Sequence, residues 1–169
     1  GISSDVNMRL AALLCDAGKA LSYTSHDNGK VTFPRHDRRA APVIDPAMKR
    51  LRYEPKIINN IIFLARNHTA AKKWGDNAEN MSDADLRSLQ YLCETRDRFE
   101  RLLTLIHADN LSHTERPSLA GQVPAIRKRA AEFKASGTEM FGFNLPIQSL
   151  HIRKLLQIQP GQKVEHCKD

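Results

Sequence analysis

The clearest structural signal in the chain is the apolar pattern between Pro55 and His68. Ile57, Ile61 and Leu64 recur at the spacing of one face of an α-helix, and His68 continues that face. A proline suits the first helical turn, because the N–H that it lacks has no helical acceptor there. The spacing therefore predicts a helix whose apolar face, with His68, points toward the core. A histidine in such a place is more often a hydrogen-bonded core residue than a ligand.

The rest of the chain shows the same kind of pattern and predicts an all-α fold. Further helices are expected over 6–17, 45–52, 82–92, 95–111, 121–136 and 148–158. Asn28-Gly29 lies between two β-prone runs and predicts a short β-hairpin or extended loop near 21–33. Pro42 and Pro46 predict a kink or break between Ala41 and Ala47, since a proline inside a helix removes a hydrogen bond. The segment 74–81 is expected to be a surface connection.

Two acidic residues occupy positions where a carboxylate is costly. Asp16 stands near the end of an apolar helix, where its charge opposes the helix dipole and its neighbours indicate burial. Asp109 continues the apolar stripe of Leu102 and Ile106. Burying its charge there would destabilise the fold unless a cation, a metal or hydrogen-bond donors contacted the carboxylate. Gly18 is expected to end the first helix as its C′ residue. Both acids are therefore predicted to have partners.

Charge and cysteine usage restrict the partners and the compartment. The net charge of +7 and the pI near 9.5 favour a polyanionic partner, with RNA the first candidate and an ordinary solvated surface the alternative. Three cysteines without paired spacing indicate reduced thiols in a cytoplasmic protein. No run approaches the ~18 apolar residues of a membrane span. Gly1 suggests a cleaved expression tag, and no signal peptide is expected.

The segment from Leu13 to Lys19 resembles the Leu-Leu-His-Asp-Ile-Gly-Lys signature of HD-type metal-dependent phosphohydrolases, with Cys15 in place of the histidine. The other unusual polar residues fall at the spacing of an HD site, which this resemblance would build from Asp16, His36, His68 and Asp109. Such a site implies a divalent metal (Mg, Mn or Zn) that lowers the pKa of bound water and stabilises charge on a phosphate. A thiolate is a soft ligand, poorly matched to magnesium or manganese. The family's first histidine, normally upstream, is also missing from this chain. The site is therefore expected to be degenerate, with no cofactor unless it is still competent.

A wider succession of motifs narrows the resemblance. The segment 10–20, the hairpin ending at Phe33, the run Ala65-Arg66-Asn67-His68 and the run His107-Ala108-Asp109 follow one another in a familiar order. They are similar to the helical region that follows the catalytic head in bacterial CCA-adding tRNA nucleotidyltransferases and poly(A) polymerases. The similarity extends from Arg9 to Gly161. The head itself, with its paired catalytic aspartates, is absent from this sequence.

The sequence predicts three segments: a flexible N-terminal segment with a tag remnant over 1–8, a helical domain over 9–112 that the resemblance makes a degenerate HD-like domain, and a basic helical tail over 113–169. The resemblance implies a non-catalytic fragment that positions tRNA or another RNA for a nucleotidyltransferase head outside this chain. Cationic side chains would neutralise RNA phosphates. The expected RNA contacts are Arg38, Arg39, Lys49, Arg50, Arg52, Lys72, Lys73, Arg127, Lys128 and Arg129. The alternative is a metal-dependent phosphohydrolase acting on phosphomonoesters or 2′,3′-cyclic nucleotides, and a third possibility is a structural or oligomerising helical module.

Overall fold

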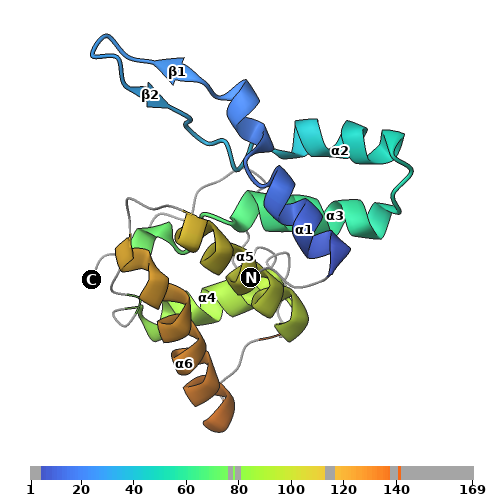
Figure 1. Ribbon diagram of the computed structural model, residues 1–169. Helices are drawn as coiled ribbons and strands as arrows, with labels where there is room; N and C mark the ends of the chain where they lie inside the picture. The colour runs from blue at the N-terminus through green and yellow to red at the C-terminus, as the bar shows by residue number, and fades with distance from the viewer. Residues whose placement is uncertain (1–4, 76–77, 79–80, 113–116, 138–140, 142–169) are drawn as a thin grey trace, which may run out of the picture.

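A computed structural model describes residues 5–75, 78, 81–112, 117–137 and 141 of the chain (Figure 1). The helix expected over 148–158 and most of the tail lie outside the described residues. The described part is mostly helical, and its only sheet is a two-stranded hairpin. The predicted all-α fold with a short hairpin is therefore confirmed. None of the described helices is both long and apolar enough to cross a membrane.

The helices agree closely with the periodic segments of the sequence. The α-helices are α1 (Val6–Leu14), α2 (Ala41–Arg50), α3 (Pro55–Asn67), α4 (Asp83–Cys93), α5 (Arg96–Ser112) and α6 (Gln122–Ala135). Short 3₁₀ helices are η1 (Ala17–Leu21), η2 (Lys72–Trp74) and η4 (Pro117–Gly121). The strands are β1 (Thr24–Ser25) and β2 (Val31–Thr32). Residues 5–8, which belong to the predicted N-terminal segment, form the cap and first turn of α1, where Met8 is buried.

The hairpin forms where the Asn-Gly pair predicts it. β1 and β2 pair antiparallel, with Thr24 opposite Thr32. Asn28 accepts a hydrogen bond from the Lys30 amide at 3.0 Å, and Gly29 takes a φ of +76°, which a glycine adopts without steric cost. The hairpin lies at the same end of the molecule as α2 and projects away from the helices (Figure 1).

The core lies between α3, α5 and the helices on either side of them. α1 packs on both α3 and α5, and α2 packs on α3. Large side chains at this contact are fully buried: Ile44, Met48, Ile61, Leu102, Leu103 and Ile106. Burial of each such side chain favours folding by roughly 1.5–3 kcal/mol. α4 and α6 pack against α5.

The predicted break between Ala41 and Ala47 is wrong, because α2 is one continuous helix. Pro42 lies in the first turn, where a missing N–H costs no helical hydrogen bond. Pro46 lies inside the helix and removes one such bond. Ile44 and Met48 are buried on either side of it, so packing against α3 holds the helix together.

Two local expectations about burial are also wrong. Ala78 and Met81 are fully buried, so the segment 74–81 is not simply a surface connection. On the helix expected over 82–92, the leucine spacing predicts an inward stripe of Leu86, Leu89 and Leu92; in α4 Leu86 and Leu89 do face the core, but Leu92 is 42% exposed and Cys93 is buried instead. The helix meets its neighbours along a stripe that ends at position 93.

A buried polar network joins α6 to the rest of the molecule. The Gln122 amide nitrogen donates hydrogen bonds to the carbonyl oxygens of Ala71 and Gly75, at 3.1 and 2.6 Å. Its Oε1 accepts a hydrogen bond from the Asn110 amide at 3.0 Å. The first helix of the predicted basic tail therefore docks on α5 and on the loop after α3, while the division at 112–113 stays a prediction.

Candidate metal centre

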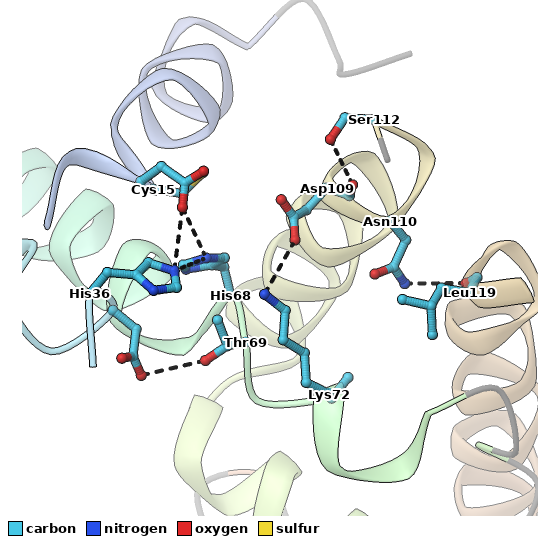
Figure 2. Close-up of polar contacts among 12 residues, drawn as sticks. Cys15, His36, His68, Thr69, Lys72, Asp109, Asn110, Ser112 and Leu119 are labelled. Carbon is cyan, nitrogen blue, oxygen red and sulfur yellow. Dashed lines mark hydrogen bonds and ion pairs between the residues drawn. The ribbon is translucent and has the colours of Figure 1, made fainter. Parts of the chain in front are cut away.

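Three of the predicted site residues meet where the ends of three elements converge. Asp16 follows α1, His36 lies in the turn before α2, and His68 caps the C-terminus of α3. The Asp16 Oδ1 atom lies 3.3 Å from His36 Nε2 and 3.8 Å from His68 Nε2. The two Nε2 atoms are 3.4 Å apart, and Figure 2 shows both imidazoles turned toward the same point. Side chains separated by up to 52 positions therefore present three ligand atoms to one small volume.

Gly18 makes this convergence possible, although not as the expected helix cap. α1 ends at Leu14, and Gly18 is buried inside η1, without the positive φ of a left-handed cap. A Cβ at position 18 would lie 1.9 Å from the His36 carbonyl oxygen and 2.7 Å from the Ala40 amide nitrogen. The absence of a side chain therefore lets the backbone that carries His36 pass directly over the segment that carries Asp16.

Backbone carbonyls fix the position of one ring proton on each imidazole. His36 Nδ1 lies 3.0 Å from the Phe33 carbonyl oxygen, and His68 Nδ1 lies 2.7 Å from the Ala65 carbonyl oxygen. A carbonyl oxygen only accepts, so each Nδ1 carries the hydrogen and donates it. In a neutral ring, Nε2 then bears a lone pair. Both lone pairs face the Asp16 carboxylate, an arrangement typical of histidines that bind metal.

The charges of the cluster favour this donor form. Burial lowers the pKa of His68 below its ordinary 6.5, and the negative charges of Asp109 and Asp16 only partly oppose this effect. Burial raises the pKa of Asp16, but the net shift is downward, below 3.8, chiefly because the Lys19 ammonium at 2.7 Å donates a hydrogen bond to the carboxylate and carries the opposite charge. At neutral pH the cluster therefore contains an ionised carboxylate facing a neutral, buried His68.

Cys15 lies beside the cluster with its proton in place. Its sulfur is within 4.8 Å of ligand atoms of Asp16 and His68, so these three residues form a possible metal-binding group. The thiol, however, donates to the Ala12 carbonyl at 3.1 Å. Burial, together with the negative charges of Asp16 and Asp109, raises its pKa to about 11. Cys15 is therefore a neutral, hydrogen-bonded thiol unless a bound cation displaces its proton.

Asp109 lies on α5, and its ion-pair partner is Lys72, a residue that the sequence analysis expected to contact RNA. Only 12% of the Asp109 side chain is exposed, and its Oδ2 lies 4.0 Å from the Lys72 ammonium (Figure 2). No motif links the two residues, since they come from η2 and α5 and meet only in the folded chain. The predicted need of Asp109 for a partner is thus met by a lysine.

Most of the predicted RNA contacts are engaged within the molecule. Hydrogen bonds or ion pairs join Arg39 to the Leu21 carbonyl, Lys49 to Asp45, Lys72 to Asp109, Lys73 to Asp85, Arg127 to Glu100 and Arg129 to Asp83. The remaining four, Arg38, Arg50, Arg52 and Lys128, are exposed and form no ion pair with the described residues. Arg50 and Arg52 lie at the C-terminal end of α2, whereas Arg38 precedes that helix and Lys128 lies on α6.

Comparisons with protein-family models, curated proteins and solved structures found no match to this chain. The resemblance to HD phosphohydrolases and CCA-adding enzymes therefore stays a prediction.

Proposed function

We propose that Asp16, His36 and His68 bind one divalent metal ion and that the protein hydrolyses a phosphate ester at this site. The observation that supports the proposal is the convergence of three lone-pair atoms at 3.3, 3.4 and 3.8 Å from one another. A tetrahedral ion with bonds of about 2.0–2.1 Å has ligand atoms roughly 3.4 Å apart. The spacing of the cluster is close to that value.

The donor set also indicates which metals fit. Two imidazole nitrogens and one carboxylate oxygen suit zinc, manganese or iron better than magnesium, which prefers oxygen ligands. Asp16 is 40% exposed, whereas His68 is buried, so the cluster opens to solvent on the Asp16 side. Three protein ligands and an open side are typical of a catalytic site, since a structural site is closed.

The surrounding residues supply functions that hydrolysis of a phosphate ester requires. A bound divalent ion would lower the pKa of a water molecule and offset negative charge on the phosphate. Lys19 and Lys72 are partly exposed and place two cations beside the opening, where they would attract and orient an anionic substrate. To Asp109, an ion-paired carboxylate on α5 with 12% of its side chain exposed, we assign the role of accepting the proton of the attacking water.

Metal content tests the first half of the proposal. Protein purified without chelator and analysed by plasma mass spectrometry should contain close to one zinc, manganese or iron per chain. Asp16→Asn and His36→Gln should lose it. His26→Gln is the matched control, because His26 bonds to Thr32 in the hairpin and is not part of the cluster. Wild-type protein that takes up no metal, even after incubation with each ion, would refute the site.

Hydrolysis of p-nitrophenyl phosphate and of 2′,3′-cyclic AMP tests the second half. Hydrolytic activity should correlate with metal content: Asp16→Asn should lose it and His26→Gln should keep it. Lys19→Gln should raise KM for the anionic substrate and leave the metal bound. A protein that binds metal stoichiometrically but hydrolyses neither substrate, with any of the three ions, would leave a metal site without this activity.

We also propose RNA positioning, for a nucleotidyltransferase head outside this chain, as a second candidate. Between His26 and Lys56 the chain has eight lysines and arginines against four acids, and Arg38, Arg50 and Arg52 in this stretch are exposed. Such an excess favours contacts with RNA phosphates. In competition gel shifts, tRNA should outcompete an unstructured RNA of equal charge. Joint replacement of Arg50 and Arg52 by glutamine should weaken tRNA binding, and equal affinity for both RNAs would argue against positioning of tRNA.

A further inference from the structure

A groove of about 640 Å³ runs along the outer face of α3, behind the segments that carry the two histidines. Its lining includes Asp37, which follows His36, and Thr69, which follows His68. These two neighbours are joined by a hydrogen bond from Thr69 Oγ1 to Asp37 Oδ2 at 3.4 Å. The groove is within the volume range of small-molecule sites, and none of its lining residues belongs to the proposed metal centre.

Two arginines give the groove its charge. Arg38 comes from the turn before α2 and Arg66 from the last turn of α3, and both are exposed. Neither forms an ion pair with another of the residues that the structure describes, whereas Lys19, Lys73 and Arg127, for example, each pair with a carboxylate. The only acid in the lining, Asp37, already accepts the Thr69 hydroxyl. Guanidinium groups so placed favour a phosphate, which they can bind through two parallel hydrogen bonds.

The rest of the lining is apolar with amide groups between. Ile62 and Phe63 form part of the wall, and Leu92 of α4 adds an apolar side chain that is 42% exposed. The Arg98 guanidinium lies 4.7 Å from the Phe63 ring centre and helps to fix that ring. Asn67 donates to the Phe63 carbonyl at 2.8 Å, which leaves its Oδ1 as an acceptor, and Asn59 offers a second amide.

We infer that this groove binds a nucleotide, with its phosphate on Arg38 and Arg66 and its base against Ile62, Phe63 and Leu92. A phosphate alone would leave the apolar wall unused, and an apolar ligand alone would leave two arginines without a partner. Amide side chains supply both donors and acceptors, which match the edge of a base. The inference does not depend on the proposed metal or on hydrolysis, since no residue of that cluster lines the groove.

Calorimetric titration of the full chain in EDTA, with AMP as the probe, tests the inference. AMP should bind, and both inorganic phosphate and adenosine should bind at least tenfold more weakly. Arg38→Gln and Arg66→Gln should each weaken AMP binding about tenfold, because each removes charge-assisted hydrogen bonds. Arg9→Gln is the matched control: an exposed arginine of α1 outside the groove, which should leave AMP affinity unchanged.

Two further variants separate the parts of the inference. Leu92→Asp, at an exposed position, should weaken binding of AMP and adenosine by opposing the base and the anion. Asp16→Asn should leave AMP affinity in EDTA unchanged, so failure of the metal proposal and failure of this one remain distinguishable. Absence of AMP binding at millimolar concentration, or an equal effect of Arg9→Gln and Arg66→Gln, would overturn the inference.

Discussion

The carbonyl oxygen of His36 sits where the side chain of residue 18 would begin, 1.9 Å from the Cβ that Gly18 lacks. This contact determines how closely the backbone of the turn that carries His36 approaches the segment after α1. It thereby sets the 3.3 Å separation between His36 Nε2 and Asp16 Oδ1. Gly18 supplies no ligand atom, but its missing side chain allows this approach, so it is a positioning residue of the candidate metal centre.

Gly18→Ala should therefore damage both stability and the site. The new methyl group meets backbone atoms of His36, Arg39 and Ala40, which cannot rotate away as a flexible side chain would. We expect a loss of about 3 kcal/mol in the free energy of unfolding, measured with urea, and weaker metal binding. Gly121→Ala is the control, because nothing lies within 4 Å of its added Cβ and its φ is negative. Equal losses in the two variants would contradict this account of Gly18.

Cys15→Ala should leave the metal bound. The thiol donates to the Ala12 carbonyl and burial raises its pKa to about 11, so it does not serve as a ligand in its resting form. Metal affinity in the variant, measured by competition with a chromophoric chelator, should stay within about threefold of the wild type. A large loss, comparable with that of Asp16→Asn, would instead make the Cys15 thiolate a fourth ligand and favour zinc.

The Gln122 network should be a strong determinant of how α6 is held. Gln122→Leu leaves the Ala71 and Gly75 carbonyls and the Asn110 amide without this partner in a buried place. We expect a destabilisation of about 2–4 kcal/mol in urea unfolding, since each buried group left unsatisfied costs roughly 1–3 kcal/mol. A double-mutant cycle with Asn110→Leu should show clear coupling between the two positions. Strictly additive effects would mean that the Asn110–Gln122 hydrogen bond contributes nothing of its own.

The helical fold was predictable because its signal is local. Ile57, Ile61 and Leu64 recur on one helical face, and the Asn28-Gly29 pair is a hairpin signal at short range. The predictions were wrong where contacts between residues far apart in the sequence determine the structure. Pro46 does not break α2, because α3 packs against its neighbours, and Met81 is buried by elements that no local pattern reveals.

The candidate site was predictable in its residue types and not in its geometry. The motif around Asp16 and the spacing to His36 and His68 identify residues that the structure brings together. The carbonyls that orient the two imidazoles, the pairing of Lys72 with Asp109 and the role of Gly18 depend on contacts between separate elements. The groove along α3 was missed for the same reason, since Arg38 and Arg66 belong to different segments.

The Asp5–Arg101 pair predicts how α1 responds to acid. Asp5 caps α1 through the Asn7 amide at 2.8 Å and accepts a hydrogen bond from Arg101, which outweighs burial and lowers the pKa of Asp5 below 3.8. A lowered pKa in the folded state stabilises the protein above pH 3.8, and the contribution is lost as pH falls through the folded-state value. Asp5→Asn keeps the cap and removes the charge, so it should cost about 0.5–1 kcal/mol at pH 7. Asp5→Ala should cost about 1 kcal/mol more, because it also removes the cap. Urea titrations between pH 7 and pH 3 should show the gap between wild type and Asp5→Asn narrowing below pH 4, and a gap independent of pH would exclude the ion pair as its cause.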